Sequence, residues 1–244
     1  MSTVDSHLIS KGASESATDH QQAAGVRRST IDCQRGWLIA ACGIDGSGKS
    51  THITLLNELA ESLGISTKVC KLLTSDSNYF KTLQDIGDQI SSDSYCNLLI
   101  FERLRRAKAI LPRFRSHYGL TILDRYILCD LAYVEAYGAS SELIQVAHSV
   151  APVPDLTIVF DVPPHEAMRR IRARGKPVYE RQENERVLKR ARRAYLNAAP
   201  SWNATIIDTN RPLTESWSQL AEIFVDLISD TSPANTERAQ QCPR

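Results

Sequence analysis

The sequence has no continuous apolar run of about 18 residues, which a membrane-spanning helix would need. Its first residues also lack the basic stretch and apolar core of a secretory signal, so we expect neither a membrane span nor secretion. Charge of one sign is not in excess either, because 29 Lys and Arg face 28 Asp and Glu and the formal net charge is +1. We therefore expect no general binding to nucleic acid or to a membrane surface.

Paired metal and disulfide motifs are missing as well. The cysteines are Cys33, Cys42, Cys70, Cys96, Cys129 and Cys242. None of them forms a C-x-x-C pair, and the six histidines are dispersed without metal-ligand spacing. This usage is typical of reduced thiols in a cytoplasmic protein, and it argues against a disulfide or zinc framework.

The clearest motif is the segment GIDGSGKS at 43–50, which matches G-x-x-x-x-G-K-[ST] in full. The apolar run 37–42 before it predicts a strand buried on both faces. Apolar residues at helical spacing from Ile53 to Leu63 predict a helix after it. A strand, a glycine loop and a helix in this order indicate a phosphate-binding P-loop.

The residue types of this loop suit phosphate binding. Glycines let backbone N–H groups turn toward a phosphate without Cβ clashes, and the helix N-terminus adds partial positive charge. Lys49 is expected to reach the β- and γ-phosphates, and the Ser50 hydroxyl to ligate Mg²⁺. We predict ATP and Mg²⁺ as cofactors, and the residues expected to hold them are Gly43, Asp45, Gly46, Ser47, Gly48, Lys49, Ser50 and Thr51.

Strands and helices alternate along the rest of the chain. Apolar strands beginning near 37, 67, 120, 156 and 205 predict an α/β P-loop NTPase fold, with a five-stranded parallel sheet, helices on both faces and a small basic lid. The expected domain is 35–229, between a disordered tail at 1–34 and a frayed tail at 230–244. The expected helices after the P-loop helix include a weak one near 83–90 and others at 97–114, 125–137, 165–174, 183–198 and 212–228. Pro112 is expected to end or bend the second of these.

An acidic and a positively charged residue follow the third strand, in the segment Asp124-Arg125-Tyr126. Ligands of open parallel sheets bind beyond the carboxyl ends of the strands. Asp124 can therefore help to hold Mg²⁺ or orient an acceptor oxygen, and Arg125 can clamp a phosphate. An Asp-Arg pair alone is a common surface feature, but beside a P-loop we interpret both residues as catalytic.

Basic residues crowd the segment 167–183. Phosphoryl transfer needs positive charge on the moving group and needs water excluded, and a basic lid meets both needs. The residues to which we assign this catalytic role are Arg172, Arg174 and Arg181. For Arg169 and Arg170 we predict a solvated helix face, and for the second basic run, 186–193, a solvated face with ion pairs at i,i+4 spacing.

From about Trp37 to Phe224 the chain resembles the thymidylate kinases. The segments that carry the resemblance are GIDGSGKST at 43–51, LLIFER at 98–103, DRYILCDLAY at 124–133 and PDLTIVFDVPPHEAMRRIRARG at 154–175. The resemblance implies phosphoryl transfer from ATP to a small phosphorylated acceptor and a possible homodimer. Some members carry an Arg at the position of Gly46, so the catalytic Arg is expected from the lid here.

The resemblance also implies an acceptor site. Asp45 would approach the sugar 3′-hydroxyl, Arg103 would contact the acceptor nucleotide, and Arg125 would bind its phosphate. The residues implied as substrate-binding are Asp45, Leu99, Arg103, Arg125 and Tyr126.

This acceptor side departs from the family pattern. The family usually has R-E-P-G after the second strand, whereas this chain has no Arg from Leu72 to Glu102. The other departures are Leu99 for a base-stacking aromatic residue, Cys129-Asp130 for a hydroxyl pair and Val134 for a glutamine. We therefore hypothesise that dTMP is a poor or secondary acceptor. The basic residues that could compensate are Lys71, Lys81 and Arg106.

Two functions follow from these observations. The first is an ATP- and Mg²⁺-dependent phosphotransferase that acts on a nucleoside monophosphate or a related phosphorylated molecule. The second is a regulatory or scaffolding protein that binds ATP and has a degenerate acceptor site. The retained Asp124 and lid arginines favour the enzyme, because binding alone needs neither.

Overall fold

The computed structural model describes residues 36–74, 77–140, 142–175 and 183–229. Within these ranges, five parallel strands form one sheet in the order β2-β3-β1-β4-β5. The strands are β1 (Trp37–Cys42), β2 (Thr67–Cys70), β3 (Leu120–Asp124), β4 (Leu156–Asp161) and β5 (Ala204–Asp208). The predicted α/β fold with a parallel sheet is confirmed.

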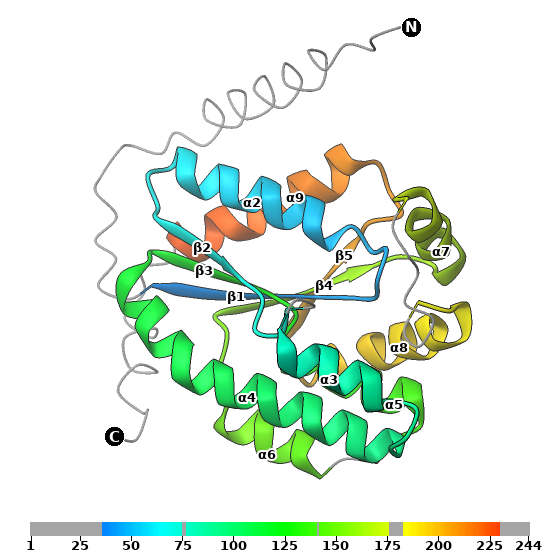
Figure 1. The fold of residues 1–244 in the computed structure, drawn as a ribbon. Helices are drawn as coiled ribbons and strands as arrows, with labels where there is room; N and C mark the ends of the chain where they lie inside the picture. Colours follow the sequence, from blue (N-terminus) through cyan, green and yellow to red (C-terminus); the bar gives the residue numbers. More distant parts are fainter. Residues whose placement is uncertain (1–35, 75–76, 141, 176–182, 230–244) are drawn as a thin grey trace, which may run out of the picture. The chain divides into compact units, whose positions relative to one another are not determined.

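Helices cover both faces of this sheet. They are α2 (Lys49–Ser62), α3 (Asn78–Ile86), α4 (Ser92–His117), α5 (Ile127–Tyr137), α6 (Leu143–Val150), α7 (Pro164–Ala173), α8 (Glu185–Ala198) and α9 (Leu213–Ser229). Helices α2 and α9 lie on one face, and α4, α5, α6 and α8 lie on the other (Figure 1). The central strands are therefore shielded on both sides, which explains why every residue of β3 is buried.

Strand register brings the predicted site residues to one edge of the sheet. Ala41, near the end of β1, pairs with Asp124, the last residue of β3. The backbone N–H of Arg125 then donates to the carbonyl of Ala41 at 3.0 Å. The P-loop and the Asp124-Arg125 pair thus leave the sheet side by side.

Helix α4 differs from its predicted range of 97–114. It begins at Ser92 because the Ser91 side chain caps it by accepting from the backbone N–H of Ser94. It also continues past Pro112, which stands inside the helix. Pro112 is exposed whereas its neighbour Leu111 is fully buried. The packed face of the helix therefore holds it together where proline removes one backbone hydrogen bond.

Several expectations fall outside the described residues, namely the tails at 1–34 and 230–244 and the lid residue Arg181. In the ranges that the structure does describe, none of the helices is both long enough and apolar enough to cross a bilayer.

Candidate active site

The P-loop runs from the end of β1 to the start of α2, and its glycines have geometric reasons to be there. Gly43, Gly46 and Gly48 have φ of 134°, 77° and 79°, which side chains disfavour. At Gly46 there is also no space, because a Cβ would lie 2.4 Å from the backbone oxygen of Ala167 in α7. The family's alternative Arg at this position would require α7 to move.

Hydrogen bonds to the P-loop backbone hold the side chain of Lys49 in place. Its Nζ donates to the carbonyl oxygens of Gly43 at 2.9 Å and Ile44 at 2.7 Å, and lies 3.4 Å from Ser47 Oγ. Burial, and then the nearby Arg125, lower the pKa of Lys49 below its ordinary value. A phosphate oxygen would add the negative charge that this buried ammonium lacks. Ser50 and Thr51 are exposed at the first turn of α2.

The P-loop is also supported by Thr209, which the sequence analysis did not single out, and through it by Arg170. Thr209 Oγ1 lies 2.9 Å from the backbone oxygen of Ser47 and 2.8 Å from that of Asp161, so it links the P-loop to β4. Arg170 donates from Nη2 to the Thr209 carbonyl at 2.9 Å. The predicted solvated role of Arg170 is thus incomplete, since it also supports the loop after β5. The segment IDTNRPL at 207–213, which contains Thr209, adds weaker support to the resemblance to thymidylate kinases and is a sequence signal near this brace.

His52 supports the same loop from α2. One ring nitrogen lies 3.0 Å from the carbonyl oxygen of Gly48, and the other lies 3.0 Å from Ser216 Oγ of α9. The imidazole is 2% exposed, and burial lowers its pKa. The neutral His52 ring thus bridges α2 and α9 and supports the end of the P-loop at Gly48.

Asp45, Arg125 and Tyr133 form a compact group between the P-loop and α5. Arg125 Nη2 pairs with Asp45 Oδ1, and the Tyr133 hydroxyl donates to Asp45 Oδ2 at 3.2 Å. The Arg125 guanidinium also lies 5.5 Å from the centre of the Tyr133 ring. Burial alone would raise the pKa of Asp45, but Arg125 and Lys49 hold it below the ordinary value. An ionised carboxylate is therefore available beside a guanidinium.

The backbone at Arg125 is unusual. Its φ is 75°, one of two positive values among the non-glycine residues that the structure describes. Such a conformation costs on the order of 1–3 kcal/mol and tends to occur at functional sites. The positive φ directs the Arg125 side chain toward Asp45, whereas the side chain of Tyr126 turns into the core. Tyr126 is 3% exposed, and its hydroxyl donates to the Pro152 carbonyl at 2.7 Å.

Asp124 has a cationic partner from the neighbouring strand end. Its Oδ2 lies 2.9 Å from Nζ of Lys71, the first residue after β2. The Asp124 side chain is 9% exposed and that of Lys71 is 57% exposed. Lys71 thus places an exposed ammonium group just after the second strand, where the sequence lacks the family's Arg. Arg106, another candidate for this role, pairs with Glu102 at 2.6 Å instead.

Arg103 and Asp130 form a buried pair between α4 and α5. The Arg103 Nε lies 2.8 Å and 3.0 Å from the two Asp130 oxygens, and both side chains are at most 7% exposed. Burial raises the pKa of Asp130 to about 6. Leu99, one turn earlier on α4, is partly buried. The predicted contact of Arg103 with the acceptor nucleotide would therefore involve a guanidinium already oriented by a carboxylate.

The predicted lid residues are only partly described. Arg172 is exposed and has no ion-pair partner among the described residues. Arg174 donates from Nη2 to Glu183 at 2.6 Å, and the Glu183 side chain is 2% exposed. The catalytic roles of these arginines stay predictions.

Comparisons with known proteins agree with this geometry. A family model described as thymidylate kinase matches residues 43–220. A probable thymidylate kinase of Archaeoglobus fulgidus is 32% identical over 195 residues, which cover 79% of this chain and 96% of that protein. One from Pyrobaculum aerophilum is 34% identical over 78% of this chain and 97% of that protein. A thymidylate kinase of Xanthomonas campestris is 33% identical over 61% and 67%.

These matches span the P-loop, the Asp45 group and the strand ends that carry them. The kinase fold, the phosphate loop and the acidic and basic residues beside it therefore point to the same class of enzyme. The chain belongs to the thymidylate kinase family and is a nucleotide kinase.

Proposed function

We propose that this protein transfers the γ-phosphoryl group of ATP to a nucleoside monophosphate or a closely related phosphorylated molecule. One observation carries the proposal: buried Lys49 and Asp45 share the P-loop, and Arg125 after β3 and Tyr133 of α5 both bind Asp45. Lys49 serves the donor phosphates, and Arg125 offers a cation to the acceptor phosphate. A protein that only bound ATP would not need this second group.

Mg²⁺ would be held by the Ser50 hydroxyl and by Asp124, directly or through water. Hydroxyl and carboxylate oxygens are the hard ligands that this ion prefers. No three His, Cys, Asp or Glu side chains gather as a metal site in the described ranges, so the nucleotide phosphates and water would supply most ligands. Because Asp124 pairs with Lys71, direct coordination would compete with that ammonium. The ion would neutralise charge on the β- and γ-phosphates.

For the acceptor, we propose that dTMP is secondary to a different nucleotide or related metabolite. Leu99 offers apolar contact but no aromatic face, which forfeits roughly 0.5–1.5 kcal/mol. Loss of the second-strand Arg removes a charge-assisted bond of about 1.5–3 kcal/mol. Together these amount to roughly 2–4.5 kcal/mol, or about 30- to 2000-fold in acceptor efficiency. Lys71 is the described cation best placed to reduce this deficit.

The test is an ADP-release assay with ATP and Mg²⁺ against a panel of nucleosides, nucleoside monophosphates and sugar phosphates. We expect acceptor-dependent ADP, with a non-dTMP acceptor giving the higher kcat/KM. A kcat/KM for dTMP of about 10⁵ M⁻¹s⁻¹ or more, without a better acceptor, would contradict the acceptor proposal. Clear ATP binding without ADP release from any acceptor would contradict the kinase proposal and favour the binding protein.

A further inference from the structure

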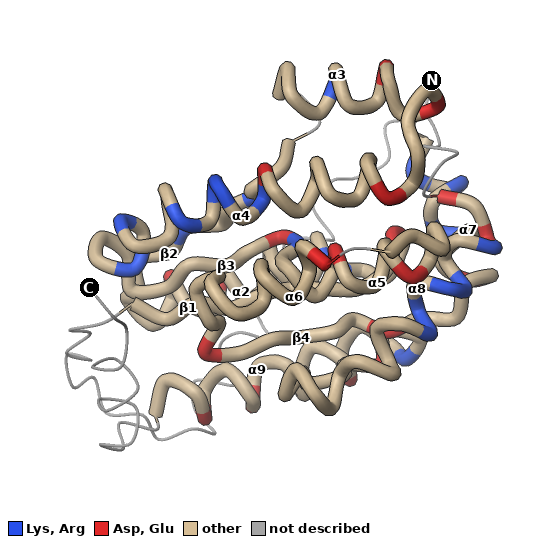
Figure 2. The backbone as a smooth tube through the Cα atoms, turned by 90° about the horizontal axis from the view of Figure 1, so that it is seen from below, with Lys and Arg blue, Asp and Glu red and all other residues tan. Residues whose placement is uncertain are grey.

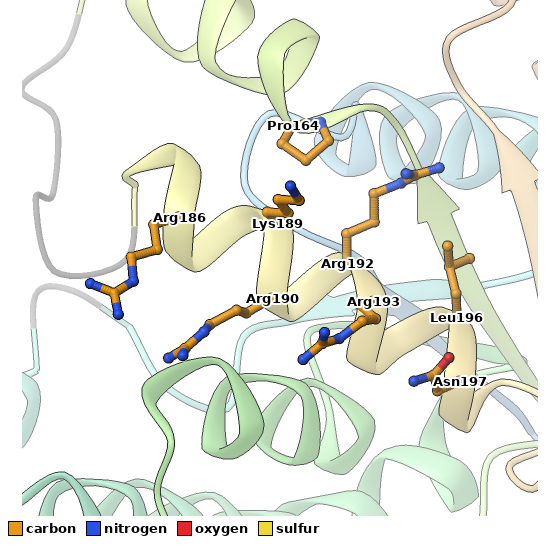
Figure 3. A pocket seen from close by; sticks show the side chains of 8 residues that line it. All are labelled: Pro164, Arg186, Lys189, Arg190, Arg192, Arg193, Leu196 and Asn197. Atoms are coloured by element: carbon orange, nitrogen blue, oxygen red, sulfur yellow. The ribbon is translucent and has the colours of Figure 1, made fainter.

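The outward side of α8 carries a concentration of positive charge that the phosphotransfer site does not use. Five basic residues stand between 186 and 193, and they recur along the helix (Figure 2). The residues Arg186, Lys189, Arg190 and Arg193 are exposed. Figure 3 shows Arg190 and Arg193 pointing to the same side of α8, whereas Arg192 points away toward the end of β4. We call the four exposed residues the α8 basic face.

Among the residues that the structure describes, this face lacks the carboxylate partners that neutralise basic residues on other helices. On α4, Glu102 pairs with both Arg105 and Arg106. On α7, Glu166 does the same for Arg169 and Arg170.

On α8, by contrast, only Arg192 has a carboxylate partner among the described residues. It makes two bonds to Asp161, of 2.7 Å and 2.8 Å. The predicted i,i+4 ion pairs are therefore absent from this helix in the part of the chain that the structure describes. Arg190 donates one bond, of 3.3 Å, to the Ala136 carbonyl, and this contact leaves its charge uncompensated.

The α8 basic face lines a groove of about 520 Å³. Pro164 forms one wall, and Leu196 and Asn197 continue the lining along α8. This volume lies within the usual range of about 300–1,000 Å³ for small-molecule sites. The groove thus combines guanidinium donors for phosphate oxygens with an apolar wall and an amide for the rest of a ligand.

The shape of the charged surface favours a compact anion. From Arg186 to Arg193 the helix rises about 10 Å at 1.5 Å per residue, which suits a chain of two or three phosphates. Single-stranded nucleic acid would call for aromatic stacking side chains, and none lines the groove. Insertion into a membrane would require an apolar helix face toward the lipid. The apolar face of α8, with Leu188 and Tyr195, is instead buried in the core.

We propose that the α8 basic face is a second anion site, separate from the P-loop, which binds a compact phosphorylated molecule with two or three linked phosphates. None of the P-loop residues lines this groove. The site lies against α5, because Arg190 contacts Ala136 in the last turn of that helix. Tyr133, which holds Asp45, stands three residues earlier on α5. Arg190, which would bind the ligand, therefore also contacts the helix that carries Tyr133.

Inorganic tripolyphosphate is the probe, measured by titration calorimetry on the full chain at 0.15 M salt. We expect two equivalents to bind the wild-type protein, one at the P-loop and one on α8. Lys49→Ala should remove the first equivalent and keep the second. The double variant Arg186→Gln/Arg193→Gln should keep the first and weaken the second about 10-fold or more, because two charge-assisted contacts are lost.

The matched control is Lys108→Gln/Arg113→Gln, which removes two charges from exposed positions of α4. It should bind tripolyphosphate like the wild type. Retention of the P-loop equivalent in the α8 variant reports that it is folded. The proposal is overturned if the wild type binds only one equivalent of tripolyphosphate and Lys49→Ala binds none. It is also overturned if the α4 control weakens tripolyphosphate binding as much as the α8 variant does. Tighter binding of a 20-nucleotide single strand or of anionic vesicles than of tripolyphosphate, lost in the α8 variant, overturns the compact-anion assignment.

Discussion

The donor and acceptor sides of the candidate active site are held together by different kinds of interaction. On the donor side, glycine conformations and backbone carbonyls shape the P-loop, and Lys49 is fixed by main-chain oxygens. On the acceptor side, side-chain ion pairs dominate, as in Lys71–Asp124 and Arg103–Asp130. A backbone cradle depends on few side chains, whereas each ion pair can be changed by one substitution. We therefore expect that substitutions which alter substrate preference lie on the acceptor side.

The largest effect is expected on the donor side. Lys49→Ala should lower kcat/KM by about 10³-fold or more, because it removes a preorganised cation from the transferring phosphoryl group. Steady-state kinetics with the best acceptor measures this, with Lys108→Ala on exposed α4 as the control. Turnover within tenfold of the wild type would contradict the assigned role of Lys49.

Asp45 lies where the two sides meet. Asp45→Asn should lower acceptor kcat/KM by about 10- to 100-fold, because Arg125 loses the charged partner that orients it. Asp226→Asn, on an exposed position of α9, is the matched control. An unchanged kcat/KM would mean that Tyr133 and the backbone alone position Arg125.

The same pair predicts a pH dependence of stability. The pKa of Asp45 in the folded protein is below its ordinary value of 3.8, so its stabilising contribution is present above about pH 4 and is lost as pH falls further. The difference in unfolding free energy between the wild type and Asp45→Asn should be constant from pH 5 to 7 and shrink toward pH 3. Urea denaturation at each pH measures it. A difference that grows on acidification would contradict this sign.

Lys71 sharpens the comparison on the acceptor side. Lys71→Met should raise the acceptor KM about 10-fold or more and leave the ATP KM unchanged, because we propose that the ammonium binds the acceptor phosphate and not the donor. Lys108→Met, on an exposed position of α4, is the control. If the acceptor KM stays within twofold, Lys71 makes only a surface ion pair of about 0–1 kcal/mol.

The smallest expected effect is an increase in kcat/KM for dTMP. Leu99→Phe should raise kcat/KM for dTMP by about 2- to 13-fold, because it restores an aromatic face worth roughly 0.5–1.5 kcal/mol. A sugar phosphate without a base is the control acceptor, and its kcat/KM should not change. An equal gain for both acceptors would mean that the substitution acts on the helix and not on base stacking.

The sequence predicts the donor side better than the acceptor side. The strand, glycine loop and helix around Lys49 are contiguous, so their geometry could be predicted from local pattern alone. The Thr209 brace joins residues 162 positions apart, and Lys71 meets Asp124 across two strand ends. Such contacts depend on the completed sheet and leave no local signature. The early start of α4 was missed because the cap at Ser91 stands outside the apolar periodicity.

The close approach of Gly46 to Ala167 has an evolutionary consequence. Any side chain at position 46 would collide with the α7 backbone, so a substitution there has to follow or accompany a shift of that helix. Lineages that gain an arginine in the loop should carry a differently placed α7, and the two changes should be inherited together.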